Sequence, residues 1–328
     1  MNRFANYLHL HCIVLIYGFT GILGKLITLS AEYLVLYRLL ITIPFICLFI
    51  FFRKESLRVD KRVLYKYLGI GIIIGLHWFT FFHSIKVSNV SVALSCFASS
   101  SLFAGILEPL IEKKSIRKLE IFSGIIVLIT LCVMLGFEIK YWQGALFGVI
   151  SAFLAALFTV LNKQLSETKA VLTMSFYEMI GALIPIALVL GVSVISLGIR
   201  NFYPLQCNWQ FPTLQDLGWL LLLASVCTAY PFAAIIKLLR SLSAFTVALA
   251  VNFEPIYSII FAFLIFGDSE RMTQVFYVGL CVVFGVVFLY PVLKKRNQHF
   301  LTFVFGNRLK FGTRKNILLR FVNFRKKK

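Results

Sequence analysis

The sequence predicts an all-α polytopic membrane protein with ten transmembrane helices, arranged as two inverted five-helix repeats. Hydrophobic residues make up 60% of the 328 residues and charged residues only 14%, whereas soluble domains carry about 25% charged residues. The mean hydropathy of +0.89 therefore excludes a soluble enzyme fold. In addition, the apolar residues form ten long runs, and basic residues gather in every second connection between them.

Each apolar run is long enough to cross a membrane, because a spanning helix needs about 20 apolar residues. Transmembrane strands would be about ten residues long and would alternate in polarity, so helices are predicted throughout. The first run is not followed by a small-residue cleavage site, so we expect it to stay in the protein as a helix. In chain order the runs lie near residues 8–29, 33–52, 66–85, 90–111, 119–137, 143–162, 171–195, 215–236, 243–265 and 273–293.

The orientation of the helices follows from the basic residues. The connections after the second, fourth, sixth and eighth runs hold most of them, for example Arg53 and Lys54, Lys113 and Lys114. The other connections hold few. Because positive loops stay on the cytoplasmic side, both termini are predicted to be cytoplasmic. The chain is expected to be a multi-pass protein of the cytoplasmic (inner) membrane.

An internal repeat divides the ten runs into two halves of five. Because five is odd, the second half inserts upside down relative to the first, an architecture that transporters use for alternating access around a midplane site. Gene duplication retained only for packing is the alternative. The matching segments are Ser88–Leu94 and Ser243–Leu249, Tyr37-Arg38 and Tyr177-Glu178, and Phe19-Thr20 and Phe158-Thr159.

These halves carry residues that resemble a known family. The S-x-x-S-V-A-L segment from Ser88, the segment Asn252-Phe-Glu-Pro255 and the segment Leu264-Ile-Phe-Gly-Asp268 are similar to the drug/metabolite transporter superfamily, EamA type. The resemblance covers about residues 8–293. It implies a ten-helix permease whose relatives mostly export small metabolites, amino acids or drugs. The family's mid-helix proline is matched by Pro255, whereas Ser100 stands at the equivalent place in the first half.

The sequence predicts that the chain is divided into three parts. Residues 1–137 form the first EamA-like five-helix repeat and residues 138–293 form the second, inverted repeat. Residues 294–328 form a basic cytoplasmic tail with twelve Lys and Arg residues and no acid. The tail could lie on the anionic inner leaflet as short amphipathic helices, or it could be a disordered extension.

The functional prediction is a secondary transporter, and in view of the resemblance an exporter, of a small organic metabolite, amino acid or drug. No Walker A loop or clustered catalytic set is present, so an enzyme, a cofactor and a metal are not expected. A non-transporting membrane scaffold or sensor is the alternative, followed by an intramembrane lipid-modifying enzyme. The partners predicted are a small-molecule solute and membrane lipids, without nucleic acid, and a homodimer is left open.

Two acids in the apolar runs are the first candidates for the solute site. An ionisable side chain at the centre of a spanning helix costs at least about 2.5–3.5 kcal/mol, so it needs a cavity or a partner. Glu254 is about nine residues into its run, or about 14 Å at 1.5 Å per residue, near the middle of a core about 30 Å thick. Glu178 is similarly deep. Both could instead make structural hydrogen bonds or ion pairs between helices.

Four further residues complete the predicted substrate-binding set. Arg38 could bind an anion, reach the headgroups, or pair with Glu178. His77 could carry a coupling proton or make a structural hydrogen bond, and Trp78 could line a cavity or pack in the core. Asn252 offers donors and an acceptor at the depth of Glu254.

Two other features are assigned to packing and to the membrane surface. Gly71 and Gly75 recur at a spacing of four residues, which allows two helix backbones to approach closely. Glu108 lies beside Lys113 and Lys114 near the inner end of its run, where a salt bridge at the membrane interface is expected.

Overall fold

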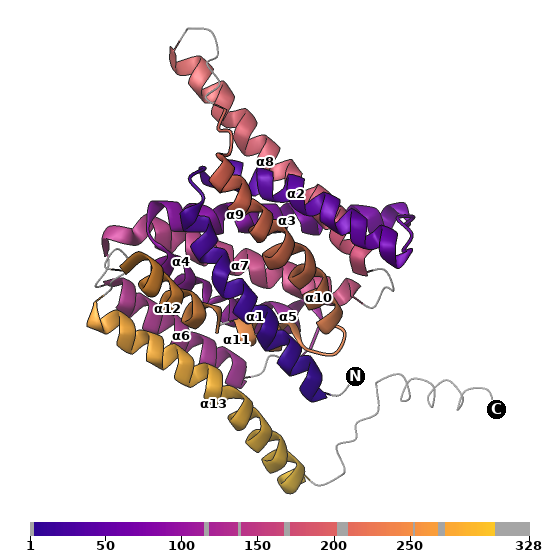
Figure 1. Cartoon of the computed structure of the whole chain (residues 1–328). Coiled ribbons are helices and arrows are strands. Elements are labelled where there is room, and N and C mark those ends of the chain that lie inside the picture. Colours follow the sequence, from indigo (N-terminus) through magenta and orange to yellow (C-terminus); the bar gives the residue numbers. More distant parts are fainter. Residues whose placement is uncertain are drawn as a thin grey trace, which may run out of the picture. The chain divides into compact units, whose positions relative to one another are not determined.

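The computed structural model describes residues 3–114, 118–136, 139–166, 171–201, 209–251, 253–267 and 273–305 (Figure 1). Within these residues every regular element is a helix, which confirms the predicted all-α fold. The chain forms two compact units, Met1–Val287 and Phe288–Lys328. The second unit is described only as the last turns of one helix, which end at Phe305, directly before Gly306. The tail predicted to lie on the membrane falls outside the described residues beyond that point.

The described residues of the first half form six helices, drawn from indigo to purple in Figure 1. They are α1 (Arg3–Leu26), α2 (Ala31–Arg53), α3 (Lys61–Val87), α4 (Val90–Phe97), α5 (Ser100–Ile111) and α6 (Lys118–Gly136).

In the second half, the described residues begin with a short 3₁₀ turn and include a π-helical segment. Its elements are η1 (Ile139–Tyr141), α7 (Trp142–Leu165), α8 (Val171–Asn201), α9 (Leu214–Ala224), the π segment η2 (Ser225–Ala229), α10 (Tyr230–Leu238), α11 (Ala244–Val251), α12 (Glu254–Phe266) and α13 (Gln274–Phe305).

Eight stretches of the described chain are long and apolar enough to cross a membrane. Two shorter apolar stretches, Ile121–Thr130 and Gln274–Val286, lie in α6 and α13, where the fifth and tenth spans are expected. The count of ten spans stays a prediction. Each predicted run falls on helical structure. The fourth and the ninth runs are each divided into two helices, and the eighth is divided into α9 and α10 by the π segment η2. The tenth run, predicted to end at residue 293, continues as α13 to Phe305.

Several helices begin where a polar side chain accepts a hydrogen bond from a free N–H group of the first turn. Asp60 accepts from the backbone N of Arg62 at the start of α3, at 2.8 Å. Thr213 and Asp216 form a reciprocal capping box at the start of α9. The Asp216 carboxylate also accepts from the backbone N of Thr28 at 2.7 Å, which ties the α1–α2 connection to α9.

The close approach of α3 and α8 depends on glycine. A Cβ atom on Gly71 would lie 2.2 Å from the carbonyl oxygen of Glu178, and one on Gly75 would lie 2.5 Å from the carbonyl oxygen of Ala182. Both distances are far below van der Waals contact, so only glycine fits. The packing role predicted for these two glycines is therefore confirmed.

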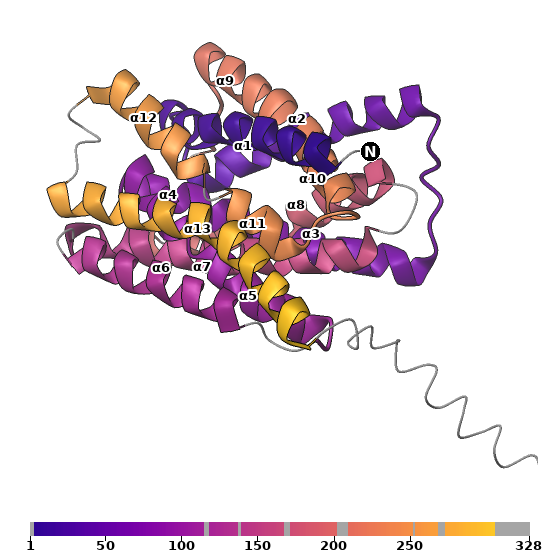
Figure 2. The ribbon, with the colours of Figure 1, turned by 90° about the horizontal axis from the view of Figure 1, so that it is seen from below.

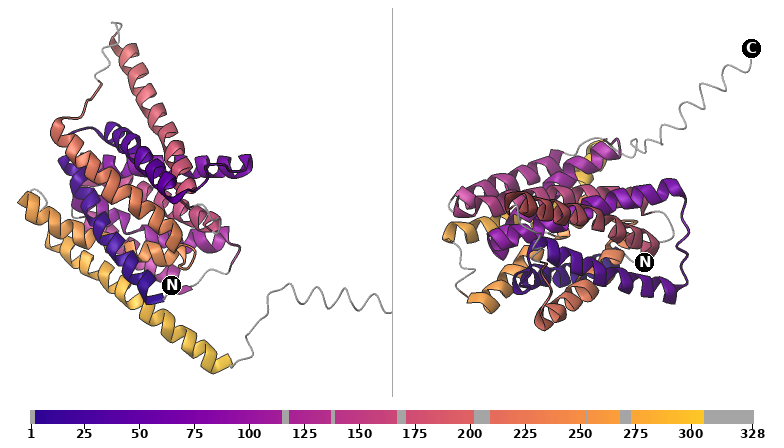
Figure 3. Two further views of the ribbon diagram at one scale, coloured as in Figure 1. Left: turned by 45° about the vertical axis from the view of Figure 1, so that its right-hand side comes forward. Right: turned by 90° about the horizontal axis from the view of Figure 1, so that it is seen from above.

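The helix contacts repeat between the halves. The helix α1 packs against α12, while α7, its counterpart, packs against α4 and α5. Similarly, α3 packs against α8, while α9 packs against α2. Figure 2 shows α5 beside α11 and α4 near α12, and Figure 3 shows α1 alongside α10. This exchange of partners is expected of two related five-helix repeats.

The interruptions of the fourth and ninth runs lie at equivalent positions. The first separates α4 from α5 at Ala98 and Ser99. The offset of 155 residues between Ser88 and Ser243 places the equivalents of these residues at Phe253 and Glu254 (98 + 155 and 99 + 155). In the structure α11 ends at Val251 and α12 begins at Glu254, so the repeat seen in the sequence sets the place where both helices break.

Candidate functional site

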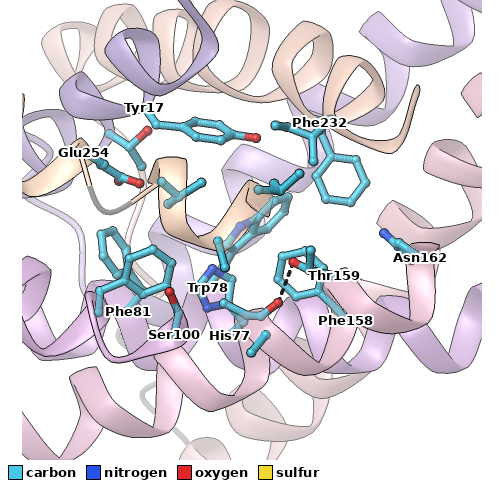
Figure 4. A pocket seen from close by; sticks show the side chains of 18 of the residues that line it. Tyr17, His77, Trp78, Phe81, Ser100, Phe158, Thr159, Asn162, Phe232 and Glu254 are labelled. Atoms are coloured by element: carbon cyan, nitrogen blue, oxygen red, sulfur yellow. Dashed lines mark hydrogen bonds between the residues drawn. The ribbon is translucent and has the colours of Figure 1, made fainter. Parts of the chain in front are cut away.

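A cavity with a volume of about 100 Å³ lies between the two halves of the helical core. Figure 4 shows how its side chains are arranged: Trp78 and His77 lie at the centre, Glu254 and Tyr17 lie toward one side, and Asn162 toward another. The walls are mostly aromatic and aliphatic, with a few polar groups between them. Such a composition is typical of binding sites for small molecules.

The cationic group of the cavity is Arg38 of α2, whose side chain is only 3% exposed. Its guanidinium lies over the Trp78 ring, 3.9 Å from the ring centroid, and its Nε atom donates to the Thr228 hydroxyl at 2.9 Å. The Nη1 atom has no hydrogen-bond partner in the described part of the chain. Arg38 is therefore a fixed, buried cation with one donor group available to a ligand.

A local distortion of the eighth span supplies the partner of Arg38. The Thr228 hydroxyl, in the π segment η2, also donates to the carbonyl of Leu223, five residues earlier in α9, at 2.6 Å. Single π turns inside α-helices occur frequently at functional sites. Here the π turn presents a hydroxyl oxygen to the arginine.

The anionic group of the cavity is Glu254, the first residue of α12, which is 5% exposed. Pro255, the second residue of α12, has no N–H group to lose at a helix start and so suits the break. Tyr17, Arg38 and Glu254 are close enough to interact electrostatically. No salt bridge joins Arg38 and Glu254 among the residues that the structure describes, so each of these two groups faces the cavity without an ion-pair partner.

His77 lines the centre of the cavity but is already bonded on one side. Its Nδ1 atom lies 2.8 Å from the Ser151 hydroxyl and 3.0 Å from the Ser151 carbonyl. Its ring stacks on Phe97, with the ring centroids 5.6 Å apart. His77 thus holds α3 against α7 and keeps one face of its ring toward the cavity.

Comparison with known proteins places this fold in a family. The sequence model of the EamA-like transporter family matches residues 6–136 and 142–290. The chain belongs to this family. A search among curated proteins gave no match. A protein known from a crystal structure aligns with 89% of this chain and 99% of its own, with a TM-score of 0.65 and 14% sequence identity, which shows the shared fold alone.

Family membership confirms the resemblance seen in the sequence. The chain is an integral, multi-pass membrane transporter of the drug/metabolite type, so a small-molecule solute and membrane lipids are its partners. Proteins of the EamA-like family are transporters and not enzymes, in agreement with the sequence-based interpretation. The two matched segments correspond to α1–α6 and to the helices from α7 into α13.

The structure places four of the six predicted residues of this EamA transporter around one cavity: Arg38, His77, Trp78 and Glu254. Asn252 lies outside the described residues. Glu178 is fully buried in α8 and does not line the cavity. The pairing of Arg38 with Glu178 that we considered is wrong, because Arg38 binds Thr228 instead. Arg38 also does not reach the headgroups, since its side chain is buried and is held by Thr228 and the Trp78 ring.

The salt bridge expected for Glu108 forms with other partners. Glu108 pairs with Lys163 of α7 and accepts from the backbone N of Phe245, at the start of α11, at 2.8 Å. The free N–H groups and the dipole of that helix end attract the carboxylate. Lys114 pairs with Glu112. The predicted Lys113 and Lys114 partners were wrong because α5 ends facing α7 and α11.

The neighbouring Glu112 follows α5, beyond the spanning segment. Burial alone would raise the pKa of its carboxyl, but hydrogen bonds and charges from Lys114 and Lys163 outweigh the burial and hold the pKa below its usual value. Glu108, Glu112 and Lys163 thus join α5, α7 and α11 at one end of the core.

Several lining residues were not singled out from the sequence. These lining residues are Tyr17, Phe97, Asn162, Thr228 and Phe232. Aromatic and hydroxyl residues are common in spanning helices, so these residues carry no signal alone. The repeat contains a signal, because Thr20 and Thr159, which occupy equivalent positions, both line the cavity.

Proposed function

We propose that this transporter is a secondary transporter that exports a small organic solute by alternating access through the central cavity. The observation that carries the proposal is the pair of buried ionisable groups, Arg38 and Glu254, that face the cavity without forming an ion pair. A buried charge that lacks a partner costs about 3–5 kcal/mol. A solute that supplies the missing partners would recover this cost and bind in the cavity.

The chemistry of the solute follows from the two charges. Arg38 offers a guanidinium whose geometry matches carboxylate and phosphate groups, and Trp78 fixes its plane. Glu254 offers a carboxylate to an amino or hydroxyl group. These groups favour a small metabolite or amino acid that carries an anionic group and a hydrogen-bond donor. The volume of about 100 Å³ is below the about 300–1,000 Å³ of pockets for drug-sized ligands, which favours a metabolite over a drug.

The lining residues extend toward the side of the membrane that is predicted to be cytoplasmic. The lining extends to Asn162, near the end of α7, and to Leu239, which caps α10. Both lie toward the ends that the positive-inside rule assigns to the cytoplasm. A cavity that reaches toward this side can accept a solute from the cytoplasm, as the first step of export requires.

The same proposal covers the arrangement of the chain in the membrane. Residues 1–137 and 138–293 would be the two inverted repeats, with both termini in the cytoplasm and the protein in the inner membrane. Arg38, Trp78, His77, Glu254 and Asn252 would bind the solute. The basic tail would bind anionic lipids, and a homodimer stays open as an assembly.

The test is a flux assay in proteoliposomes that hold the purified protein. Amino acids, short organic acids and neutral sugars would be offered separately as radiolabelled solutes. We expect saturable flux for solutes that carry a carboxylate and little flux for neutral sugars. Arg38→Gln should lower the apparent affinity at least about tenfold, or about 1.4 kcal/mol.

Arg53→Gln is the matched control, because it removes the same charge from the exposed end of the same helix. Unchanged flux in Arg38→Gln, or equal losses in both variants, would contradict the role of Arg38. Absence of flux for every solute class, with folded protein in the vesicles, would contradict the transport mechanism.

A further inference from the structure

The second buried acid of the apolar spans, Glu178, has a setting unlike that of Glu254. Its side chain lies in α8 with 0% of its surface exposed. Neither carboxyl oxygen has a hydrogen-bond partner among the described residues. Among the described residues, Glu178 therefore neither lines the cavity nor forms an ion pair.

Three ionisable side chains on the helices around Glu178 are either engaged elsewhere or exposed. The helix α8 packs against α2, α3 and α10. Arg38 of α2 is bonded to Thr228, His77 of α3 is bonded to Ser151, and Lys237 of α10 is exposed. Tyr67 of α3 makes no hydrogen bond to the carboxyl either. The polar side chain that faces the carboxyl is the neutral Asn162 of α7.

Close packing keeps water away from the α3 side of Glu178. The helices α3 and α8 meet through glycines, and a Cβ on Gly71 or on Gly181 would lie 2.2 Å or 2.4 Å from backbone oxygens of the opposite helix. No solvent layer fits between helices at this distance. On the α7 side the neighbour of the carboxyl is Asn162, which itself lines the central cavity.

Energetics then determine the state of the carboxyl. An ionised carboxylate without a counter-charge in such surroundings costs several kcal/mol, whereas the neutral acid avoids most of this cost. The stable form in this conformation is therefore the carboxylic acid. To release its proton, the carboxyl has to reach the water of the cavity or gain a positive partner.

We propose that Glu178, with Asn162 beside it, is a proton-binding site that couples solute movement to a proton gradient. The inference rests on the proposed transport function and deepens it. In one conformation the carboxyl holds the proton. In another, the O–H bond breaks, the proton passes to water in the cavity, and a carboxylate remains until a proton from the other side binds.

A metal cation fits the site less well. Hard cations such as Ca²⁺ take six to eight oxygen ligands and Mg²⁺ takes six, whereas Glu178 and Asn162 offer two carboxyl oxygens and one amide oxygen. If transport depended on a cation such as sodium and not on protons, the assignment of Glu178 as a proton site would be overturned.

The first experiment measures the proton directly and needs no solute. Infrared difference spectra of the full-length protein in detergent would be recorded across pH for the wild type and for Glu178→Gln. We expect a band from protonated carboxylic acid at neutral pH whose Glu178 part is seen as the difference between wild type and Glu178→Gln, in which the signal of the other buried acid, Glu254, cancels. The control Glu32→Gln, which alters an acid bonded to Ser30 at the start of α2, should keep the full band. Absence of this difference overturns the proposal, even if transport is confirmed.

The second experiment tests coupling with a solute that passes the flux assay. With a pH gradient imposed and sodium absent, wild-type vesicles should accumulate the solute, and their solute exchange should vary with pH. Glu178→Gln should lose the accumulation, and its exchange should no longer vary with pH. Normal pH-driven accumulation in Glu178→Gln, or accumulation that requires sodium in the wild type, overturns the proposal.

Asn162→Leu provides an independent variant if Glu178→Gln does not fold. It leaves the acid in place and removes its polar neighbour on the path to the cavity. We expect the midpoint of the infrared titration to move by about one pH unit, a tenfold change in proton affinity. An unmoved midpoint would mean that Asn162 does not contact the proton site. A wild type that shows the infrared band but no flux for any solute would count against the transport proposal and not against the protonated acid.

Discussion

Substitution of Gly71 by alanine tests the closest helix contact in the core. The new Cβ would lie 2.2 Å from the carbonyl oxygen of Glu178 and 2.8 Å from the Cα of Gly181. Ordinary contact needs about 3.5 Å, so α3 and α8 would have to separate by about 1.3 Å. Because the atoms that clash belong to the backbone, a rotamer change cannot relieve the clash. Overpacking of this kind costs about 1–3 kcal/mol.

Gly69→Ala is the matched control on the same helix. No atom lies within 4 Å of a Cβ built at Gly69. Both substitutions gain about 1 kcal/mol of helix propensity, so the difference between the two variants isolates the overpacking. Thermal unfolding in detergent, followed by tryptophan fluorescence at one scan rate, should give a lower Tm for Gly71→Ala than for Gly69→Ala. Equal Tm values would refute the inference that α3 and α8 pack through glycine.

Three further predictions concern charge and topology. Glu254→Gln should lower the apparent solute affinity at least about tenfold while expression stays normal; normal flux would make Glu254 structural. Glu112→Gln should destabilise the protein at neutral pH, because the pKa of Glu112 is lowered in the folded state. The stability that Glu112 contributes is present above the unfolded-state pKa of about 4.3 and is lost as the pH falls through the folded-state pKa. Thermal scans in which the difference from wild type persists at low pH would refute this. Reporter fusions should read cytoplasmic at three positions and external at three others, and two or more contradictions would refute the inverted topology. The cytoplasmic positions are 60, 115 and 167, and the external positions are 87, 140 and 205.

The helices themselves could be predicted from the sequence because spanning segments leave a strong apolar signal. The runs near 66–85 and 143–162 lie within α3 and α7. The breaks at Ala98–Ser99 and at Phe253 were less visible. Pro255 marks the break at Phe253. The break at Ala98–Ser99 contains no proline, because Ser99 and Ser100 stand at the equivalent positions. Serines are compatible with a continuous helix, so the first break follows from the repeat and not from local propensity.

The candidate site was only partly predictable, for a physical reason. Depth along a helix can be read from the sequence, so buried charges such as Arg38, Glu178 and Glu254 were found. The direction in which a side chain points depends on how the helices rotate and pack. The sequence therefore could not separate Glu254, which lines the cavity, from Glu178, which does not. Nor could it predict the π segment that brings Thr228 to Arg38.

The position shared by Arg38 and Glu178 has an evolutionary consequence. In a symmetric dimer of identical five-helix chains every residue is present twice, so a charge at this position would appear twice with one sign. Two like charges buried near one axis repel each other and disfavour the charged state. Once two such halves are joined in a single polypeptide, each can mutate alone. A basic residue can then occupy this position in one half and an acidic residue in the other. Gene fusion therefore allows the two halves to carry different charges, which a homodimer of half-transporters could not evolve.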